Sequence, residues 1–266
     1  MGYECLVSMK ISIITASYNS ELTINNTVES LASQTHEDIE YILIDGASAD
    51  NTVEIVKRYK NISLIVSEPD NGIYDAMNKG IKLATGDIVG TLNADDFYID
   101  NSVLSEIAKI FEDDSIDACF ADLVYVNQFD TSKVVRYWKS RPYKVGLFKQ
   151  GWMPAHPTFF ARKRVYEKYG IFDLNYKIAA DFELLFRFVE QSKIKTYYLP
   201  KVLVKMRLGG TTNKNLKNIH AQNNEMIRVL RAHYHDFSAL QFWWYKIINR
   251  FIQLNSRPKA ASRLVS

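Results

Sequence analysis

The sequence predicts an α/β protein with a mostly parallel central sheet, helices on both faces and a helical C-terminal tail. Three observations support this class: short apolar runs, helical patterns between them, and polar residues where the runs end. The apolar runs are rich in Ile and Val, as in strands buried on both faces. They are ISIITAS (11–17), IEYILID (39–45), ISLIVS (62–67) and DIVGTLN (87–93).

Between these runs, apolar residues recur at the spacing of one face of a helix. The three helical segments are 22–34, 52–59 and 73–84, and Ser20 is the expected N-cap of the first. Strands that alternate with helices over about ninety residues predict a parallel sheet with right-handed crossovers.

The pattern changes after FADLVYV (120–126), which is expected to be a strand. Residues 127–155 are aromatic and basic with weak periodicity, so we expect an irregular segment there. The remaining predicted elements are a strand and short helix in PTFFARKRVYEKYGIFD, a helix over 181–191, a strand over 195–207 and a helical tail from Asn215. We divide the chain into a main domain, 1–212, and a tail, 213–266.

Composition excludes several classes of protein. With 33 basic and 30 acidic residues the net charge is +3, too balanced for recognition of nucleic acid by charge alone. The first ten residues, MGYECLVSMK, lack the basic start and apolar core of a signal peptide. No apolar run reaches the roughly 18 residues that a membrane span needs. We therefore expect a cytoplasmic protein, alone or on the cytoplasmic face of the membrane.

Polar residues follow three of the predicted strands. Ser17, Asp45 and the Asn93–Asp96 segment each lie at a carboxyl end, and ligands of open parallel sheets bind at that edge. The adjacent carboxylates of Asp95 and Asp96 repel each other and need a reason to be together. They are either a solvated turn that caps a helix near 101–113 or half of a cation site.

Three ordered stretches together resemble the family 2 glycosyltransferases, which are inverting enzymes with one nucleotide-sugar-binding α/β domain of the GT-A type. They are ISIITASYNSELTINNTVESLASQTHEDIEYILIDGASADNT, SEPDNGIYDAMNKGIKLATGDIVGTLNADD and AHPTFFARKRVYEKYGIFDLNYKIAADFELLFR, within about 10–210. The resemblance is greatest to bacterial enzymes that extend surface polysaccharides such as O-antigen or capsule. It implies a nucleotide-sugar-binding half, 10–126, and an acceptor-binding half, 127–212.

The resemblance assigns roles to the acidic segment. Asp95 would be the carboxylate that holds a divalent metal, Mg²⁺ or Mn²⁺, and Asp96 would support the site. The family commonly has Asp where this chain has Asn93, a position near the ribose or metal, so one charge is missing here.

The same resemblance places the base of the nucleotide at the first two strands. Asp45 would accept the imide N–H of the base, which favours uracil and a UDP-sugar, and Thr15 and Ser17 would line the pocket. The alternatives are ordinary polar loop residues and a turn in which Asp50 caps the next helix.

Further donor-binding residues follow from the resemblance. Asp75, Asn78 and Lys79 lie on one predicted helix and would reach the nucleotide, with Lys79 near the diphosphate, although a solvated lysine is the alternative. The segment VKMRLGGTT resembles one that closes over the diphosphate, so Arg207 would clamp phosphate. The family often has a histidine after that arginine, where this chain has Leu208.

Inversion in one displacement needs one carboxylate that takes the proton of the acceptor hydroxyl. By resemblance this base is Asp181, and the acid that often precedes it is Ala180 here. Glu183 lies about 200° further around a helix and cannot serve the same site. A helix cap is the alternative role for Asp181. His156 would bind the acceptor, with a structural histidine as its alternative.

These assignments predict a metal-dependent inverting glycosyltransferase that moves a sugar from a UDP-sugar to a growing glycan, lipid-linked in this interpretation. One alternative is a sugar nucleotidyltransferase, but TASYNSELT lacks the Gly-rich basic loop that such an enzyme has after its first strand. Another is an inactive nucleotide-sugar-binding or scaffold subunit.

The tail carries an aromatic and basic segment, FSALQFWWYKIINRFIQL. Trp and Tyr favour the lipid interface and basic residues favour anionic headgroups, so 237–256 is expected to lie in the membrane surface. The alternative is that these aromatic side chains cover the main domain or a second subunit.

Overall fold

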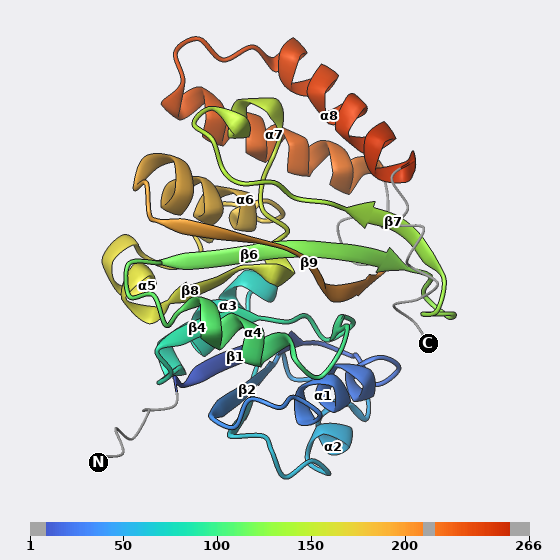
Figure 1. The fold of residues 1–266 in the computed structure, drawn as a ribbon. Helices are drawn as coiled ribbons and strands as arrows, with labels where there is room; N and C mark the ends of the chain where they lie inside the picture. The colour runs from blue at the N-terminus through green and yellow to red at the C-terminus, as the bar shows by residue number, and fades with distance from the viewer. Residues whose placement is uncertain (1–8, 210–215, 256–266) are drawn as a thin grey trace, which may run out of the picture.

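The computed structural model describes residues 9–209 and 216–255, which form one mixed sheet covered by helices on both faces (Figure 1). The strands are β1 Ile11–Ser17, β2 Ile39–Asp45, β3 Leu64–Ser67, β4 Ile88–Thr91, β5 Phe97–Tyr98, β6 Ala118–Val126, β7 Val134–Trp138, β8 Phe160–Arg162 and β9 Thr196–Arg207. The α-helices are α1 Ile24–Ala32, α2 Thr52–Val56, α3 Ile73–Leu83, α4 Val103–Ile110, α5 Lys163–Tyr169, α6 Ala180–Leu185, α7 Leu216–His233 and α8 Ala239–Asn255.

The strand order is β3-β2-β1-β4-β8-β6-β9-β5, and β7 pairs with β6 beside that path. The first four of these are parallel, as expected, whereas β8 is antiparallel to both β4 and β6. The register of β1 and β2 sets Ser17 directly opposite Asp45. The polar strand ends therefore lie level at one edge of the sheet.

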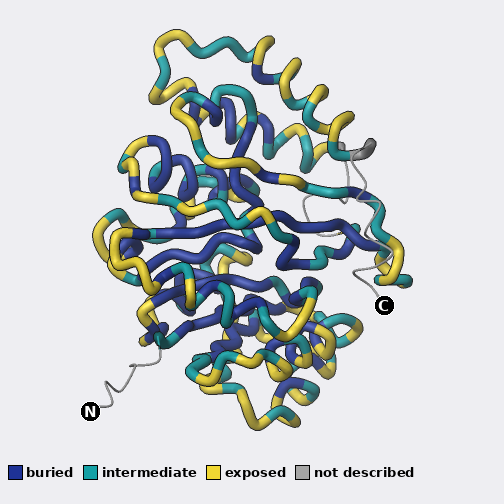
Figure 2. Tube along the Cα trace, viewed as in Figure 1, coloured by how far each residue is buried: buried dark blue, intermediate teal, exposed yellow. Residues whose placement is uncertain are grey.

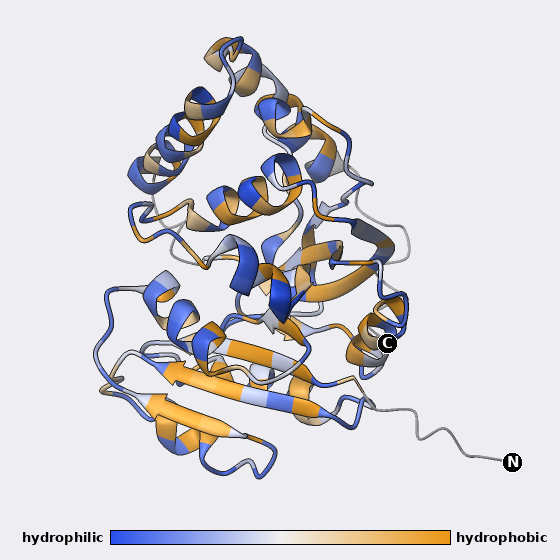
Figure 3. Cartoon of the chain, turned by 90° about the vertical axis from the view of Figure 1, so that its left-hand side faces the viewer, coloured by the Kyte–Doolittle hydropathy of each residue, from blue (hydrophilic) through white to orange (hydrophobic). Residues whose placement is uncertain are grey.

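Alternation along the strands divides the core into two layers. Ile13 belongs to a cluster with α1, α2 and α4, while its neighbour Ile14 belongs to a cluster with α3, α5, α6 and α7. Gly80 lets α3 approach β1, since a Cβ atom there would lie 2.3 Å from Cγ2 of Ile14. Figure 3 shows the strands as mainly hydrophobic and the helices as mixed.

Some local expectations are wrong. The ISLIVS strand is an edge strand, not one buried on both faces, and its Leu64 is 37% exposed. The segment after β6 is not wholly irregular, because β7 forms a hairpin with β6. The helix expected over 181–191 is present, and its second half, Phe186–Gln191, is π-helical.

The tail packs on the main domain. Met226 and Leu230 of α7 and Phe242 of α8 belong to the same buried cluster as Phe186. Helix α8 lies against β7 and the 3₁₀ turn Leu147–Gln150. In Figure 1 the helix is seen above β7. One face of the aromatic segment therefore covers the domain, and Figure 2 shows exposed positions along its other side.

Candidate active site

Asp45 at the end of β2 is fully buried and accepts four hydrogen bonds. Ser17 Oγ (2.9 Å) and Ser48 Oγ (2.5 Å) donate to Oδ1, and Ser48 N (2.9 Å) and Ser67 Oγ (2.7 Å) donate to Oδ2. These donors fix the carboxylate at the sheet edge. Because its four lone-pair sites are occupied, the N–H of a bound base must replace one of the hydroxyl donors.

Thr15 lies deeper on the same strand. It is fully buried, and its Oγ1 accepts a hydrogen bond from the Tyr41 hydroxyl at 3.2 Å. In this structure Thr15 therefore lies beneath Ser17 and not at the open edge. Asp50 accepts the backbone N–H of Thr52 at 2.9 Å, the start of α2, so its role as a cap is compatible with a separate role for Asp45.

The two adjacent carboxylates differ in environment. Asp95 is partly exposed, and its backbone carbonyl accepts a hydrogen bond from Arg207 Nη1 at 2.7 Å. Asp96 is fully buried, with Oδ2 held by Asn93 Nδ2 at 2.9 Å and Oδ1 without a hydrogen-bond partner. Burial, and next the charge of Asp95, raise the pKa of Asp96 well above its usual range.

The helix-cap alternative for this pair fails. Helix α4 begins after Ser102, whose backbone N–H donates a hydrogen bond of 2.9 Å to Asp100 Oδ1. Neither Asp95 nor Asp96 is used there. Something other than helix capping must account for a buried carboxylate beside a second one.

A divalent cation fits this arrangement. Over 9–209 and 216–255 no three His, Cys, Asp or Glu side chains gather into a metal-binding group. Mg²⁺ commonly uses only one or two protein carboxylates and takes its other oxygens from water and phosphate. The orphaned Oδ1 of Asp96 and the carboxylate of Asp95 supply such a pair.

Asp181 lies at the start of α6, partly exposed. Its Oδ1 accepts the backbone N–H of Phe182 at 2.8 Å and lies 3.2 Å from the hydroxyl of Tyr74, which also donates to the carbonyl of Ile178 at 3.0 Å. Burial, and then the charge of Asp181, raise the pKa of Tyr74 well above its usual range. Tyr74 thus stays a neutral donor that holds the carboxylate.

The N-terminus of α6 is closed by Glu225 of α7. Its carboxylate accepts the backbone N–H groups of Lys177 (3.0 Å), Ile178 (3.0 Å) and Ala179 (2.9 Å). Asp181 accepts one N–H of the first turn itself, that of Phe182, so the capping alternative stays open beside its expected role as base. No sequence pattern pointed to Glu225, because it lies about forty-five residues further along the chain.

His156 and Glu183 have different relations to Asp181. Burial lowers the pKa of His156, the negative charge of Asp181 opposes that shift, and the imidazole ring packs against Phe172. Glu183 instead pairs with Arg187 at 2.8 Å, one helical turn away. The expectation that Glu183 serves a separate purpose agrees with this ion pair.

The α3 residues are engaged within the protein. Asn78 is buried and exchanges two hydrogen bonds of 2.9 Å with the backbone of Phe172, while Lys79 pairs with Glu68 at 2.8 Å. Asp75 accepts the backbone N–H of Asn71 at 3.0 Å. Their contact with a nucleotide stays a prediction.

The hydroxyl of Tyr125 on β6 experiences the charges of both acidic groups. Burial raises the pKa of its hydroxyl, Arg250 opposes the shift, and Asp96 and Asp181 add to it. The Tyr125 hydroxyl therefore lies within electrostatic range of both Asp96 and the expected base. Its alternating position in FADLVYV gave no sign of this role.

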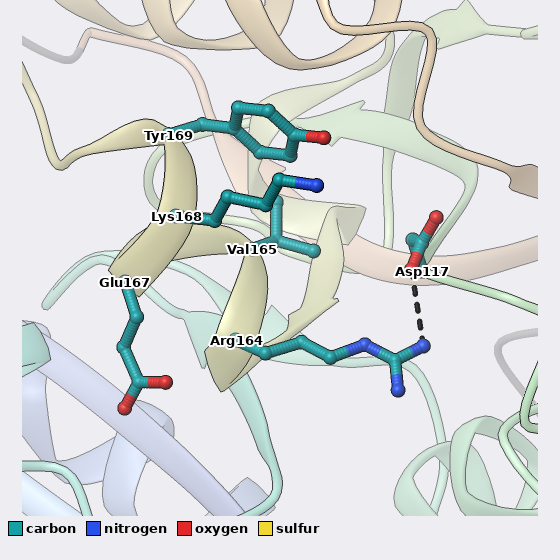
Figure 4. A pocket seen from close by; sticks show the side chains of 6 residues that line it. All are labelled: Asp117, Arg164, Val165, Glu167, Lys168 and Tyr169. Atoms are coloured by element: carbon teal, nitrogen blue, oxygen red, sulfur yellow. Dashed lines mark hydrogen bonds and ion pairs between the residues drawn. The ribbon is translucent and has the colours of Figure 1, made fainter.

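A separate surface hollow lies beside α5 (Figure 4). Its lining includes Asp117 and Arg164, whose charged groups are 3.1 Å apart, and Tyr169. Asp117 directly precedes β6, whereas the acidic pair lies near the opposite ends of the strands. The hollow is therefore not part of the site.

Comparison with known proteins identifies the family. Residues 12–170 match the model of glycosyl transferase family 2. The chain is 30% identical over 207 residues to a PGL/p-HBAD biosynthesis glycosyltransferase of Mycobacterium tuberculosis, covering 76% of this chain and 78% of that one. It is 28% identical over 218 residues to an uncharacterized glycosyltransferase of Rickettsia typhi, covering 79% and 68%. The chain belongs to glycosyltransferase family 2.

Solved structures confirm the expected fold. Staphylococcus aureus TarS 1–349 in complex with UDP superposes with a TM-score of 0.62 at 19% identity, covering 95% of this chain and 74% of that one. The mannosyltransferase PcManGT from Pyrobaculum calidifontis, in complex with GDP-Man and Mn²⁺, gives 0.65 at 17% identity, covering 98% and 74%. The mixed sheet and its helices are those of a GT-A glycosyltransferase.

Proposed function

We propose that this glycosyltransferase moves a sugar from a UDP-sugar to a growing lipid-linked glycan, with inversion and with a divalent metal, in the synthesis of a surface polysaccharide such as O-antigen or capsule. The observation that carries the proposal is the buried Asp96 with its orphaned oxygen, next to Asp95 beyond the end of β4, in a chain of glycosyltransferase family 2. The UDP complex of TarS and the Mn²⁺ complex of PcManGT support the donor and metal.

In this proposal the donor lies along the carboxyl edge of β1, β2 and β4. Asp45 and Ser17 bind the uracil, and Asp95 with Asp96 would hold Mg²⁺ or Mn²⁺. Such an ion neutralises the charge that develops on the departing diphosphate. Arg207, already fixed at the Asp95 carbonyl, adds positive charge at the same place.

Asp181 acts as general base. Tyr74 and the backbone of Phe182 orient its Oδ1, which leaves Oδ2 to accept the proton of the acceptor hydroxyl. As it loses its proton, the acceptor oxygen attacks the anomeric carbon from the face opposite the UDP group, and UDP leaves. A single displacement therefore inverts the configuration. In this proposal His156 binds the acceptor.

The donor proposal is tested by UDP-induced thermal stabilisation. A ligand that binds only the folded state raises its stability by mass action. We expect UDP with Mn²⁺ to raise the melting temperature of the wild type more than UDP alone, and Asp95→Ala to lose this metal-dependent part. Glu112→Ala, which removes an exposed carboxylate at the end of α4, is the matched control.

An equal shift with and without metal in both proteins would reject the site. The donor identity is then read from a panel of sugar nucleotides, by UDP release with and without a lipid-linked acceptor. Formation of UTP from pyrophosphate and a UDP-sugar would instead indicate the sugar nucleotidyltransferase alternative. Binding of UDP with no turnover of any donor would indicate the inactive subunit.

We also propose that α8 docks on the cytoplasmic face of the membrane. No helix within 9–209 or 216–255 is long and apolar enough to cross a bilayer. On α8 the polar side chain of Lys246 turns inward to Asn223, whereas apolar side chains point outward. The outward residues are Leu240 (84% exposed), Trp244 (64%), Ile247 (62%), Phe251 (69%) and Ile252 (52%).

Flotation with anionic vesicles tests this docking. We expect the double variant Trp244→Ser/Ile247→Ser to bind roughly 30–1,000-fold more weakly, since each side chain gives up about 1–2 kcal/mol of apolar burial in the membrane. Leu22→Ser, which changes an equally exposed residue outside the tail, should float like the wild type. Unchanged UDP stabilisation shows that the fold persists. A wild type that stays with the soluble fraction contradicts the proposal.

A further inference from the structure

Arg136 of β7 is a buried cation without a charged partner. Only 4% of the residue is exposed, and its guanidinium carbon lies 3.5 Å from the centre of the Tyr125 ring. Its Nε is buried without a hydrogen-bond acceptor, and in the described part of the chain Arg136 forms no ion pair. The tyrosine ring is the only contact that offsets its charge there.

Such an arrangement is costly unless a ligand completes it. The guanidinium stays protonated and carries five N–H donors in a planar fork that fits carboxylate or phosphate. Burying a charge without an anion or acceptors is strongly unfavourable. The ring of Tyr125 contributes about 2 kcal/mol at most for a desolvated cation. Arg136 therefore has donors available for a group that is not part of the protein.

The position of Arg136 brings it into the reaction site. It pairs with Tyr125 across β6 and β7, and Tyr125 pairs with Met206 across β6 and β9. Met206 directly precedes Arg207, the residue bonded to the Asp95 carbonyl. The hydroxyl of Tyr125 also experiences the charges of Asp96 and Asp181. Arg136 thus lies on the strands next to Arg207 and the acidic segment.

Helix α8, which packs on β7, carries two more cations. Lys246 is half-buried, donates to Asn223 Oδ1 at 2.6 Å and contacts Met226 Sδ at 3.4 Å. Burial lowers the pKa of Lys246 to about 8, and the charge of Asp181 opposes that shift. Arg250, one turn further on, opposes the shift of Tyr125. Within the described residues neither cation forms an ion pair.

We propose that Arg136, with Lys246 and Arg250 of the helix that packs on β7, binds a phosphate-bearing group of the acceptor. The inference rests on the proposed glycosyl transfer and names the chemistry of its acceptor. Three positive charges without carboxylate partners match a diphosphate better than a single carboxylate, and phosphate accepts the paired N–H groups of a guanidinium. The donor diphosphate has its own partners in Arg207 and the metal carboxylates. The acceptor would therefore carry its phosphates on the side of β7 and α8.

The test measures the affinities of the full-length protein for two anions by calorimetry. The acceptor probe is farnesyl diphosphate, added with UDP and Mn²⁺ already bound, and the donor probe is UDP with Mn²⁺. We expect Arg136→Gln to lower the affinity for farnesyl diphosphate at least 10-fold and to change the affinity for UDP less than twofold. Arg136→Lys, which keeps the charge but loses the fork, should lose an intermediate amount. Arg141→Gln, an exposed arginine on the same segment, is the matched control.

Each other outcome has a defined meaning. If Arg136→Gln lowers the affinities for UDP and for farnesyl diphosphate equally, Arg136 serves the donor and the proposal is overturned. Unchanged binding of farnesyl diphosphate also overturns it. Farnesol in place of the diphosphate checks that the loss concerns the anion. If Arg136→Gln fails to fold, Arg136→Lys and Lys246→Met give the same measurement. A wild type without metal-dependent UDP binding rejects the proposed function, and the farnesyl diphosphate titration still decides the anion site.

Discussion

Replacing Asp181 by Asn should lower the rate of sugar transfer by roughly 10²–10⁴-fold, the usual contribution of a general base. The amide keeps the size of the carboxylate and can still accept from Tyr74 and the Phe182 backbone. What it loses is the ability to take a proton. UDP and acceptor affinity should therefore change little, so the loss appears in kcat and not in KM.

Initial rates over a range of acceptor concentrations measure this separation, with UDP-induced stabilisation as the check on folding. Glu183→Gln is a matched carboxylate-to-amide change two residues away. Since Glu183 pairs with Arg187, that variant should lose some stability and keep most of its kcat. If Asp181→Asn transfers sugar at close to the wild-type rate, the base is another residue.

Glu225→Ala should lower kcat by roughly 10–100-fold and destabilise the protein by about 2–4 kcal/mol. Its carboxylate accepts three backbone N–H groups just before Asp181. Hydrogen bonds to a charged group contribute about 1.5–3 kcal/mol each, and they are not additive. Without them the turn that carries Asp181 relaxes, and a shift of about 1 Å can cost 10²-fold in rate.

Urea unfolding and steady-state kinetics together test this positioning role. Glu225→Gln keeps an acceptor oxygen without the charge and should fall between the wild type and Glu225→Ala. Asn224→Ala, an exposed change on the same helix, should match the wild type. UDP binding should persist in all variants. A stable Glu225→Ala protein with wild-type kcat would show that the hydrogen bonds do not position the base.

The parallel half of the fold follows from local patterns, because each strand is a continuous apolar run and each crossover helix carries an apolar face. The expected fold class is confirmed, but β5 has only two residues and β7 is defined by its pairing with β6. The edge position of β3 depends on strand order, which composition does not reveal. Tertiary pairing decides these elements.

The candidate site divides in a similar way. Adjacent carboxylates at a strand end are visible in the sequence, as are polar residues at the neighbouring ends. Whether a side chain is already engaged is not visible, as Asn78 and Lys79 show. Arg136 and Glu225 also escaped notice because their significance lies in partners remote in sequence, or in the lack of one.

The close fit of α8 bears on the exchange of segments between members of this family. Gly151 has φ +68°, and a Cβ atom there would lie 2.6 Å from Cγ of Lys246. Glu225 likewise serves a turn that belongs to the other part of the chain. A chimera that joins this tail to a foreign main domain inherits neither match. Crossovers in recombined enzymes should therefore fall outside 151–246, so that both pairs come from one parent.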